Sequence, residues 1–237
     1  MSSLCNTIKA IFIKDIVTEL RVKEVVPAMI VLGMLIVWVL RLVSEVGSVN
    51  AHVMGPAALW IAFLFAALLA QERSFAAEQR HDCINGLLLA PVDAGDIYLA
   101  KLLINVTMLC VFEIIVVPIV ILAFKLSVSG GIEKLIAVLL LGNIGISSVG
   151  TLFSAMVHVS RIRGSLLSIL VLTVLMPMMI PATFALLLCF GAIPPELSGI
   201  GALAMVDNFK TAISYLVGFD AIFVTASWLL FGFVVQE

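Results

Sequence analysis

The chain has 237 residues, of which 63% are hydrophobic and 12% are charged, and its formal net charge is −2. Soluble domains are about 45–50% apolar and about 25% charged, so this composition excludes an ordinary soluble protein and indicates a membrane protein. The small negative charge argues against nucleic acid as a partner. The four cysteines form no CxxC pair, which argues against a zinc site and against a disulfide framework.

Residues 1–24 precede the first long apolar stretch and are predicted to form an interfacial helix. Apolar residues recur here at roughly helical spacing, bordered by charges: Leu4, Ile8, Phe12, Ile16 and Leu20. A helix with such a stripe can lie along the inner leaflet of a membrane. Charged residues continue up to the first apolar stretch, and no small-residue cleavage site follows it, so a cleavable signal peptide is not expected.

Six apolar segments are long enough to be membrane spans, because a helix needs about 20 apolar residues to cross the hydrocarbon. They cover residues 25–43, 55–70, 102–124, 135–159, 164–192 and 211–235. The second segment is short, and residues 46–53 can lengthen it. The sequence therefore predicts an all-α integral membrane protein with six transmembrane helices, and residues 1–237 form a single transmembrane domain.

The distribution of Lys and Arg predicts the orientation of these spans, because inner loops carry an excess of both residues. With the N-terminus inside, nine of the 13 basic residues lie inside and four lie outside. The inner set is Lys9, Lys14, Arg21, Lys23, Arg73, Arg80, Lys101, Arg161 and Arg163, and the outer set is Arg41, Lys125, Lys134 and Lys210. Both termini are therefore expected inside, and so is the charged segment 71–101 between the second and third spans.

Segment 71–101 concentrates charge between two apolar spans, and we interpret it as a docking surface for a soluble partner. Its first part can continue the second span as a helix, and Asn85 and Gly86 then form a turn signal. Leucines at 87–89 offer a short apolar face that Pro91 ends, and Asp93 can cap the next helix. The predicted order is a helix, an apolar elbow (residues 87–91) and a capped helix.

Two carboxyl groups, those of Glu113 and Asp220, fall inside predicted spans. An acidic residue at the bilayer centre costs about 2.5–3.5 kcal/mol on insertion scales, so both are expected to face protein or water. Each can belong to a transport path or a hinge, or can be a protonated or hydrogen-bonded packing group. A small polar stripe on the fourth span favours close helix packing, with the lining of a path as the alternative: Asn143, Ser147, Gly150 and Ser154.

The sequence predicts no catalytic or metal site. It contains no GxxxxGK[ST] motif, so the chain cannot cradle ATP phosphates by itself. The histidines, His52, His81 and His158, share no helical spacing. His52 is expected to be a solvated loop residue, with a heme ligand as the alternative.

Four stretches of this sequence resemble known exporter permeases. GLLLAPVDAGDIYLAK at 86–101 is similar to the first cytoplasmic loop of ABC-2-type permeases. FIKDIVTELRVK at 12–23, ALWIAFLFAALLAQERSFAAE at 58–78 and RGSLL…LMPMMIPA at 163–182 resemble the heme exporter protein B (CcmB-like) family of cytochrome c maturation. The resemblance covers most of the chain, although the residues after Glu78 follow the family pattern only loosely.

The resemblance also singles out particular residues. The family's Arg-x-Phe with a following acidic residue matches Arg73, Phe75 and Glu78, and its Pro-x-x-x-Pro matches Pro177 and Pro181. The apolar elbow is expected to have a polar rim that includes Arg80, Asp82 and Asp93. The elbow, its rim and these matches give the expected partner-coupling residues: Arg73, Phe75, Glu78, Arg80, Leu87, Leu88, Leu89, Pro91 and Asp93. Pro177 and Pro181 join Glu113 and Asp220 as candidates for a transport path or for packing.

The resemblance implies a multi-pass, non-catalytic permease subunit of an ABC transporter in the cell inner membrane. It would form a homodimer with two copies of a cytoplasmic ATPase and would work with a Trp-rich, heme-handling membrane protein. ATP hydrolysis in the ATPase would drive heme export, or release of a heme-loaded chaperone, in cytochrome c biogenesis. Heme is then a candidate substrate, and no cofactor is expected on this chain alone.

Three alternatives to heme export stay open from the sequence. The first is an ABC-2-type permease that exports a lipid or a polysaccharide. The second is a membrane scaffold that transports nothing. The third is a secondary transporter, although such proteins usually contain inverted repeats, which this sequence does not show.

Overall fold

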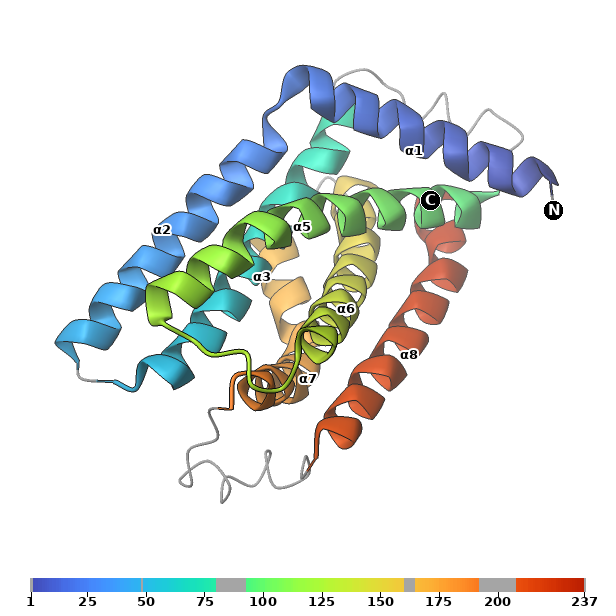
Figure 1. Cartoon of the computed structure of the whole chain (residues 1–237). Helices are drawn as coiled ribbons and strands as arrows, with labels where there is room; N and C mark the ends of the chain where they lie inside the picture. The colour runs from blue at the N-terminus through green and yellow to red at the C-terminus, as the bar shows by residue number, and fades with distance from the viewer. Residues whose placement is uncertain (1, 48, 80–92, 160–164, 192–207, 237) are drawn as a thin grey trace.

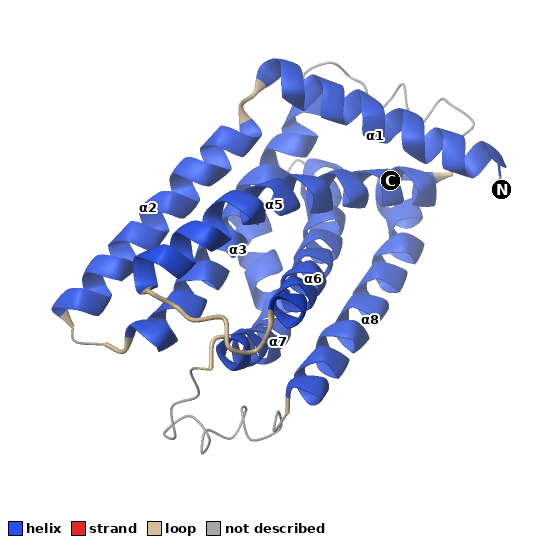
Figure 2. Ribbon diagram, in the orientation of Figure 1, coloured by secondary structure: helices blue, strands red, loops and turns tan. Residues whose placement is uncertain are grey.

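The computed structural model of the chain describes residues 2–47, 49–79, 93–159, 165–191 and 208–236. Within these ranges all regular secondary structure is helical, as Figure 2 shows. The helices are α1 (Ser2–Val22), α2 (Val25–Val46), α3 (Ala51–Gln79), α5 (Ala94–Phe124), α6 (Ile132–Val159), α7 (Ser165–Cys189) and α8 (Phe209–Gln236).

Six of these helices, α2, α3 and α5 to α8, are long and apolar enough to cross a membrane. The remaining helix, α1, precedes the first span and matches the predicted interfacial helix. The prediction of an all-α fold with six membrane spans is therefore confirmed for the described part of the chain.

The helices differ from the predicted segments mainly at their ends. Helix α3 starts at Ala51 and continues to Gln79, well past the apolar segment 55–70, and this confirms that the helix of the second span continues into segment 71–101. Helix α5 starts at Ala94, eight residues before the apolar segment 102–124. Its 31 residues make it about 46 Å long, whereas the hydrocarbon core is about 30 Å thick. Polar residues near the ends can therefore stay helical outside the hydrocarbon.

Figure 1 shows that α1 lies across one end of the bundle and packs along the first half of α5. The C-terminal ends of α3 and α8 and the start of α5 lie at this same end of the bundle. The predicted placement of the N- and C-terminal helices on one side is therefore observed. The distribution of Lys and Arg predicts that this side faces the cytoplasm.

A sharp corner joins α1 to α2. Lys23 adopts a left-handed backbone conformation with a φ of 54°, and its N–H donates to the carbonyl of Glu19 over 2.7 Å. The Glu19 carboxylate accepts hydrogen bonds from the N–H groups of Val25 and Val26 at 2.9 and 3.2 Å. This satisfies free donors at the start of α2 and places negative charge at the positive end of its helix dipole. The corner turns the chain from the surface helix into the first span.

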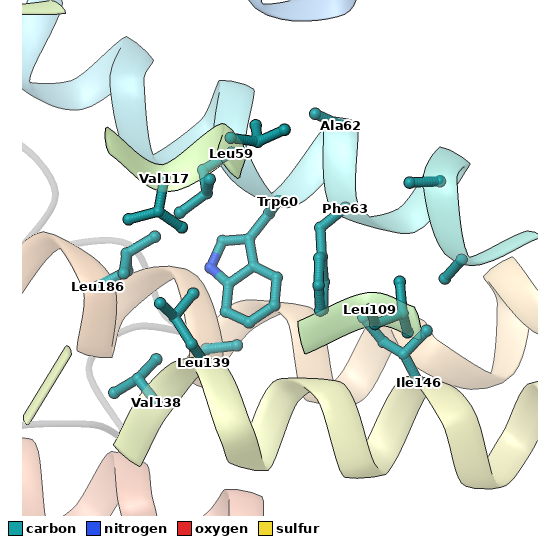
Figure 3. Close-up of a cluster of buried hydrophobic side chains, with 14 of the residues drawn as sticks. Leu59, Trp60, Ala62, Phe63, Leu109, Val117, Val138, Leu139, Ile146 and Leu186 are labelled. Carbon is teal, nitrogen blue, oxygen red and sulfur yellow. The ribbon is translucent and has the colours of Figure 1, made fainter. Parts of the chain in front are cut away.

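The core of the bundle surrounds α3 (Figure 3). The Trp60 and Phe63 rings meet edge to face with their centroids 5.7 Å apart, and the Trp60 ring packs directly against Gly142 of α6. A Cβ at Gly142 would collide with the indole, so only glycine permits this close approach. Lipid tails are as apolar as the side chains, so the hydrophobic effect does not drive membrane helices together. Close van der Waals packing of this kind holds them together instead. Helices α2 and α8 contribute least to the core and present mostly exposed apolar faces.

Candidate functional site

The structure fixes the two ends of the predicted docking segment 71–101 and leaves its middle undescribed. Positions 73, 75 and 78, predicted as coupling residues, lie on the last turns of α3, and their side chains lie outside the described residues. The following predicted coupling residues also lie outside the described residues: Arg80, Leu87, Leu88, Leu89 and Pro91. Asp93 is described and exposed.

Asp93 is the N-cap residue of α5, as predicted, but its side chain does not cap. Its backbone is extended, with φ −67° and ψ 136°, and its carbonyl accepts the first helical hydrogen bonds, from Asp96 at 2.9 Å and Ile97 at 3.4 Å. Its carboxylate forms no capping hydrogen bond. The predicted position is therefore confirmed, whereas the predicted side-chain cap is wrong.

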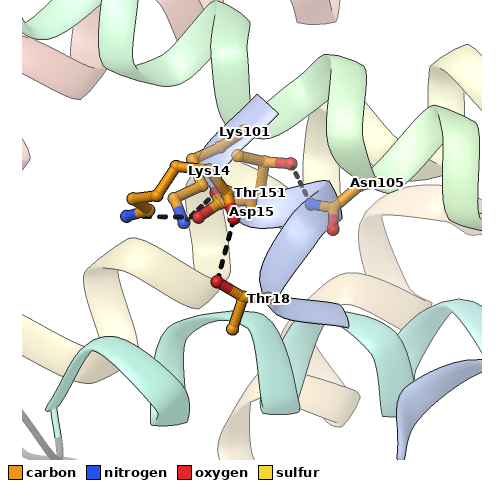
Figure 4. Close-up of polar contacts among 6 residues, drawn as sticks. All are labelled: Lys14, Asp15, Thr18, Lys101, Asn105 and Thr151. Atoms are coloured by element: carbon orange, nitrogen blue, oxygen red, sulfur yellow. Dashed lines mark hydrogen bonds and ion pairs between the residues drawn. The ribbon is translucent and has the colours of Figure 1, made fainter. Parts of the chain in front are cut away.

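Lys101 lies inside α5, two turns after its start, and its side chain is only 2% exposed. Its Nζ lies 2.8 Å from Oδ2 of Asp15 on α1. Lys14 also lies near this carboxylate, at 3.2 Å from Oδ1 (Figure 4). A buried ammonium group requires a compensating negative charge, and Asp15 supplies it. The sequence placed Lys101 in a cytoplasmic loop and did not identify Asp15 as a partner.

A seam of hydrogen bonds follows one turn further along α5. Asn105 donates to the Thr151 hydroxyl of α6 over 2.8 Å (Figure 4). Asn143 donates to the carbonyl of Val106 over 3.1 Å, and Ser147 donates to the Asn143 side-chain oxygen over 3.2 Å. These polar side chains of α6 are buried and bonded within the bundle. This arrangement supports the packing interpretation of the polar stripe on the fourth span.

Gln71 joins α3 to α6 at the other end of the docking segment. Its side-chain amide donates to the carbonyl of Ile146 over 3.3 Å, and its own carbonyl accepts from the Ser154 hydroxyl over 3.0 Å. The Gln71 amide group lies against Gly150, where a Cβ would collide with it. Gln71 is 1% exposed. Both ends of the segment are therefore held by polar contacts inside the helix bundle, Gln71 to α6 and Lys101 to α1.

The two carboxyl groups that fall within the spans lie on different helices, α5 and α8. Glu113 of α5 and Asp220 of α8 are 8% and 6% exposed, so both face protein, as predicted. Within the described part of the chain, Oε1 of Glu113 and both carboxyl oxygens of Asp220 have no hydrogen-bond partner. Hydrogen bonding therefore does not explain either carboxyl group as a packing element.

Pro177 and Pro181 lie inside α7, which continues as a helix through both. Pro181 is buried and Pro177 is exposed. Each proline removes one hydrogen bond from the helix interior, which makes this stretch easier to bend. Met178 lies between them and is buried in the core, as expected for a packing methionine.

The histidines do not gather into a site in the described structure. His52 is exposed at the start of α3, with its N–H donated to the Asn50 side chain over 3.0 Å. The side chain of His158 and the whole of His81 lie outside the described residues. No group of three His, Cys, Asp or Glu residues in the described ranges has the arrangement of a metal site.

Comparison with known proteins gives one family. The family model described as CcmB protein matches residues 6–227 of the chain. A search among curated proteins found no significant match. The match begins in α1 and ends within α8, so it includes the other five membrane helices completely. It agrees with the family resemblance of the three stretches 12–23, 58–78 and 163–182. The chain belongs to the CcmB family of membrane heme-exporter permeases.

Proposed function

We propose that this chain is the membrane subunit of an ABC transporter of the cell inner membrane and that a separate cytoplasmic ATPase docks on segment 71–101. Membership of the CcmB family supports the permease role. The single observation that carries the coupling role is the anchoring of both ends of this segment, by Gln71 to α6 and by Lys101 to α1. A partner that displaces the segment would therefore also displace the helices to which its ends are bonded, α6 and α1.

In this mechanism, closure of the ATPase pair displaces the elbow at 87–91. The displacement reaches α3 at one end and α5 at the other, because the segment joins these two helices. Gln71 passes the motion of α3 to α6, and Lys101 makes α1 move together with the start of α5. The ATPase performs the hydrolysis, and this chain converts closure into a change of helix angles.

The partners follow from the family resemblance. We propose a homodimer of this chain with two ATPase subunits, working beside a Trp-rich membrane protein that handles heme. The exposed apolar faces of α2 and α8 leave room for contacts with a second copy or with that protein.

ATP hydrolysis can drive either heme export or release of a heme-loaded chaperone. The interior of the bundle favours release of the chaperone. The described basic side chains of the spanning helices lie near helix ends, at Arg41, Lys101, Lys134 and Lys210, whereas the carboxyl groups of Glu113 and Asp220 lie deep inside. Among the described residues, the middle of the bundle therefore offers no cation to the propionates of heme. Mechanical work at a subunit interface fits it better than passage of heme through one bundle.

Glu113, Asp220, Pro177 and Pro181 remain candidates for the transport step or for packing. The amide variants Glu113→Gln and Asp220→Asn distinguish the two roles, because each preserves size. If both variants insert and support normal cytochrome c maturation, the packing role holds.

The experiment that tests the proposed function is reconstitution with a partner ATPase. Purified chain and ATPase are placed in vesicles, and two quantities are followed after addition of ATP: heme b taken up by a heme-binding protein trapped inside, and heme-loaded chaperone released from the membrane. The proposal predicts that at least one of them depends on ATP and stops when the ATPase cannot hydrolyse ATP. ATP-independent behaviour of both, with an intact complex, would contradict it.

A further inference from the structure

Asp220 occupies an unusual position in the bundle. It lies near the middle of α8, a helix of 28 residues, and it is 6% exposed. Its Oδ1 and the Met178 sulfur each lie 2.6 Å from the position that a Cβ on Gly145 would take. The carboxyl group therefore points at Gly145 of α6 beside a thioether of α7, and the missing side chain at 145 makes the room for it.

Among the described residues, neither carboxyl oxygen of Asp220 has a hydrogen-bond partner that would compensate a negative charge. Helix α8 packs against α5, α6 and α7. The charged or titratable side chains described on these four helices, apart from Asp220 itself, are Asp96, Tyr98, Lys101, Cys110, Glu113, Glu133, Lys134, Cys189, Lys210 and Tyr215. Within the described structure neither oxygen of Asp220 forms a hydrogen bond with any of them.

The cations among these side chains lie at the ends of the bundle. Lys101 pairs with Asp15 at the inner end of α5. Lys134 lies 5.4 Å from the ring centroid of Phe209, at the outer ends of α6 and α8, and Lys210 is the neighbour of Phe209. A buried carboxylate without a partner is strongly unfavourable, and such a group takes up a proton instead.

We propose that Asp220 is a proton-binding site within the α6–α7–α8 contact. Its carboxyl group holds a proton while the three helices pack as they do here, and it releases the proton when they separate and water reaches it. The ligand is a proton, bound through one O–H bond at the carboxyl group. This site is independent of segment 71–101, so it stands whether or not an ATPase docks there.

Infrared spectroscopy of the full-length protein in phospholipid vesicles tests the proposal directly, because a protonated carboxyl group has a carbonyl stretching band that a carboxylate lacks. At neutral pH, Asp220→Asn should remove such a band, and the band should shift in D₂O. Asp220→Glu should move the band without abolishing it. Asp93→Asn is the matched control: Asp93 is exposed, so only carboxylate bands should disappear. If Asp220→Asn removes carboxylate bands and leaves the protonated carboxyl bands intact, the proposal is wrong.

A pair of glycine variants tests the link between the proton and the α6 contact. Gly145→Ala places a methyl group 2.6 Å from Oδ1 and should push the carboxyl group out of its site. At least half of the Asp220 band should then be replaced by carboxylate bands at neutral pH. Gly218→Ala is the control, since no described atom outside its own stretch of helix lies within 4 Å of the added methyl group, and its spectrum should match that of the wild type. An unchanged Asp220 band in Gly145→Ala protein with intact helical bands would contradict the proposal.

Discussion

The ammonium group of Lys101 is a single charge that holds two helices together. It is buried on α5 and reaches a carboxylate of α1, 86 residues away in the sequence. Asp15 is less buried than Lys101, with 16% of its side chain exposed, and it also contacts Lys14. The two partners are therefore not equivalent, because Lys101 is the more deeply buried of the two charges.

This asymmetry predicts the effects of two substitutions. Asp15→Asn should lower the free energy of unfolding by about 3 kcal/mol, the lower end of the cost of breaking a buried ion pair. Lys101→Met should cost less, because the methionine still fills the space and Asp15 keeps Lys14. Thermal unfolding in detergent measures both. The control is Glu45→Gln, which breaks the outer Arg41–Glu45 pair with its 55% exposed carboxylate; exposed pairs contribute about 0–1 kcal/mol. Equal losses in all three variants would contradict the burial argument.

The same residue shows where sequence reasoning reaches its limit. The apolar segment begins at Leu102, so hydropathy placed Lys101 in the loop, although the helix begins at Ala94. A charged residue can remain helical and buried when another element supplies a counter-charge, and no local pattern identifies that element. The sequence shows the charges of Asp15 and Lys101, but it does not show that these two residues pair.

The contact between α3 and α6 lies at the start of the docking segment, because Gln71 makes it. The polar stripe of α6 predicted close packing, and the structure bears this out, with Gly150 against the Gln71 amide and Ser154 bonded to the Gln71 carbonyl. The identity of the opposing helix could not be predicted, because Gln71 lies 83 residues from Ser154 and the stripe alone does not say which helix it faces.

Gly150→Ala should therefore separate α3 from α6. The added methyl group collides with the Gln71 amide, so the amide must leave its site or the helices must part. Overpacking of this kind typically costs about 1–3 kcal/mol. Gly218→Ala, at an open position of α8, should be neutral or stabilising, since alanine favours a helix by about 1 kcal/mol over glycine. Unfolding in detergent compares the two variants, and a Gly150→Ala protein as stable as Gly218→Ala would contradict the predicted contact.

At the scale of the whole molecule, α1, the start of α5 and the ends of α3 and α8 meet on one side of the bundle (Figure 1). The number of spans and the charge distribution were sufficient to predict this arrangement, because both depend on composition rather than on long-range contacts. The long C-terminal extension of α3 was predicted as well, since the helical pattern continues there beyond the apolar residues.

The predicted orientation can be checked by labelling cysteines introduced into a variant without native cysteines. Val49 lies in the short connection between α2 and α3, and Asp93 lies at the opposite side of the membrane; both are exposed. Val49→Cys should react with an impermeant thiol reagent in intact cells, and Asp93→Cys should react only after the membrane is opened. The reverse pattern would place segment 71–101 outside and remove its access to a cytoplasmic ATPase.

The central claim is that the elbow at 87–91 docks the ATPase, and co-purification of tagged permease with its ATPase tests it most directly. Burial of one leucine side chain contributes about 1.5–3 kcal/mol, so Leu88→Asp should leave the permease in the membrane, strip the ATPase from it and stop cytochrome c maturation. Leu88→Met should retain the ATPase, and Arg80→Ala, on the expected polar rim, should lose less of it, because exposed ion pairs contribute about 0–1 kcal/mol. A full complement of ATPase on the inserted Leu88→Asp protein would show that the elbow is not the docking site.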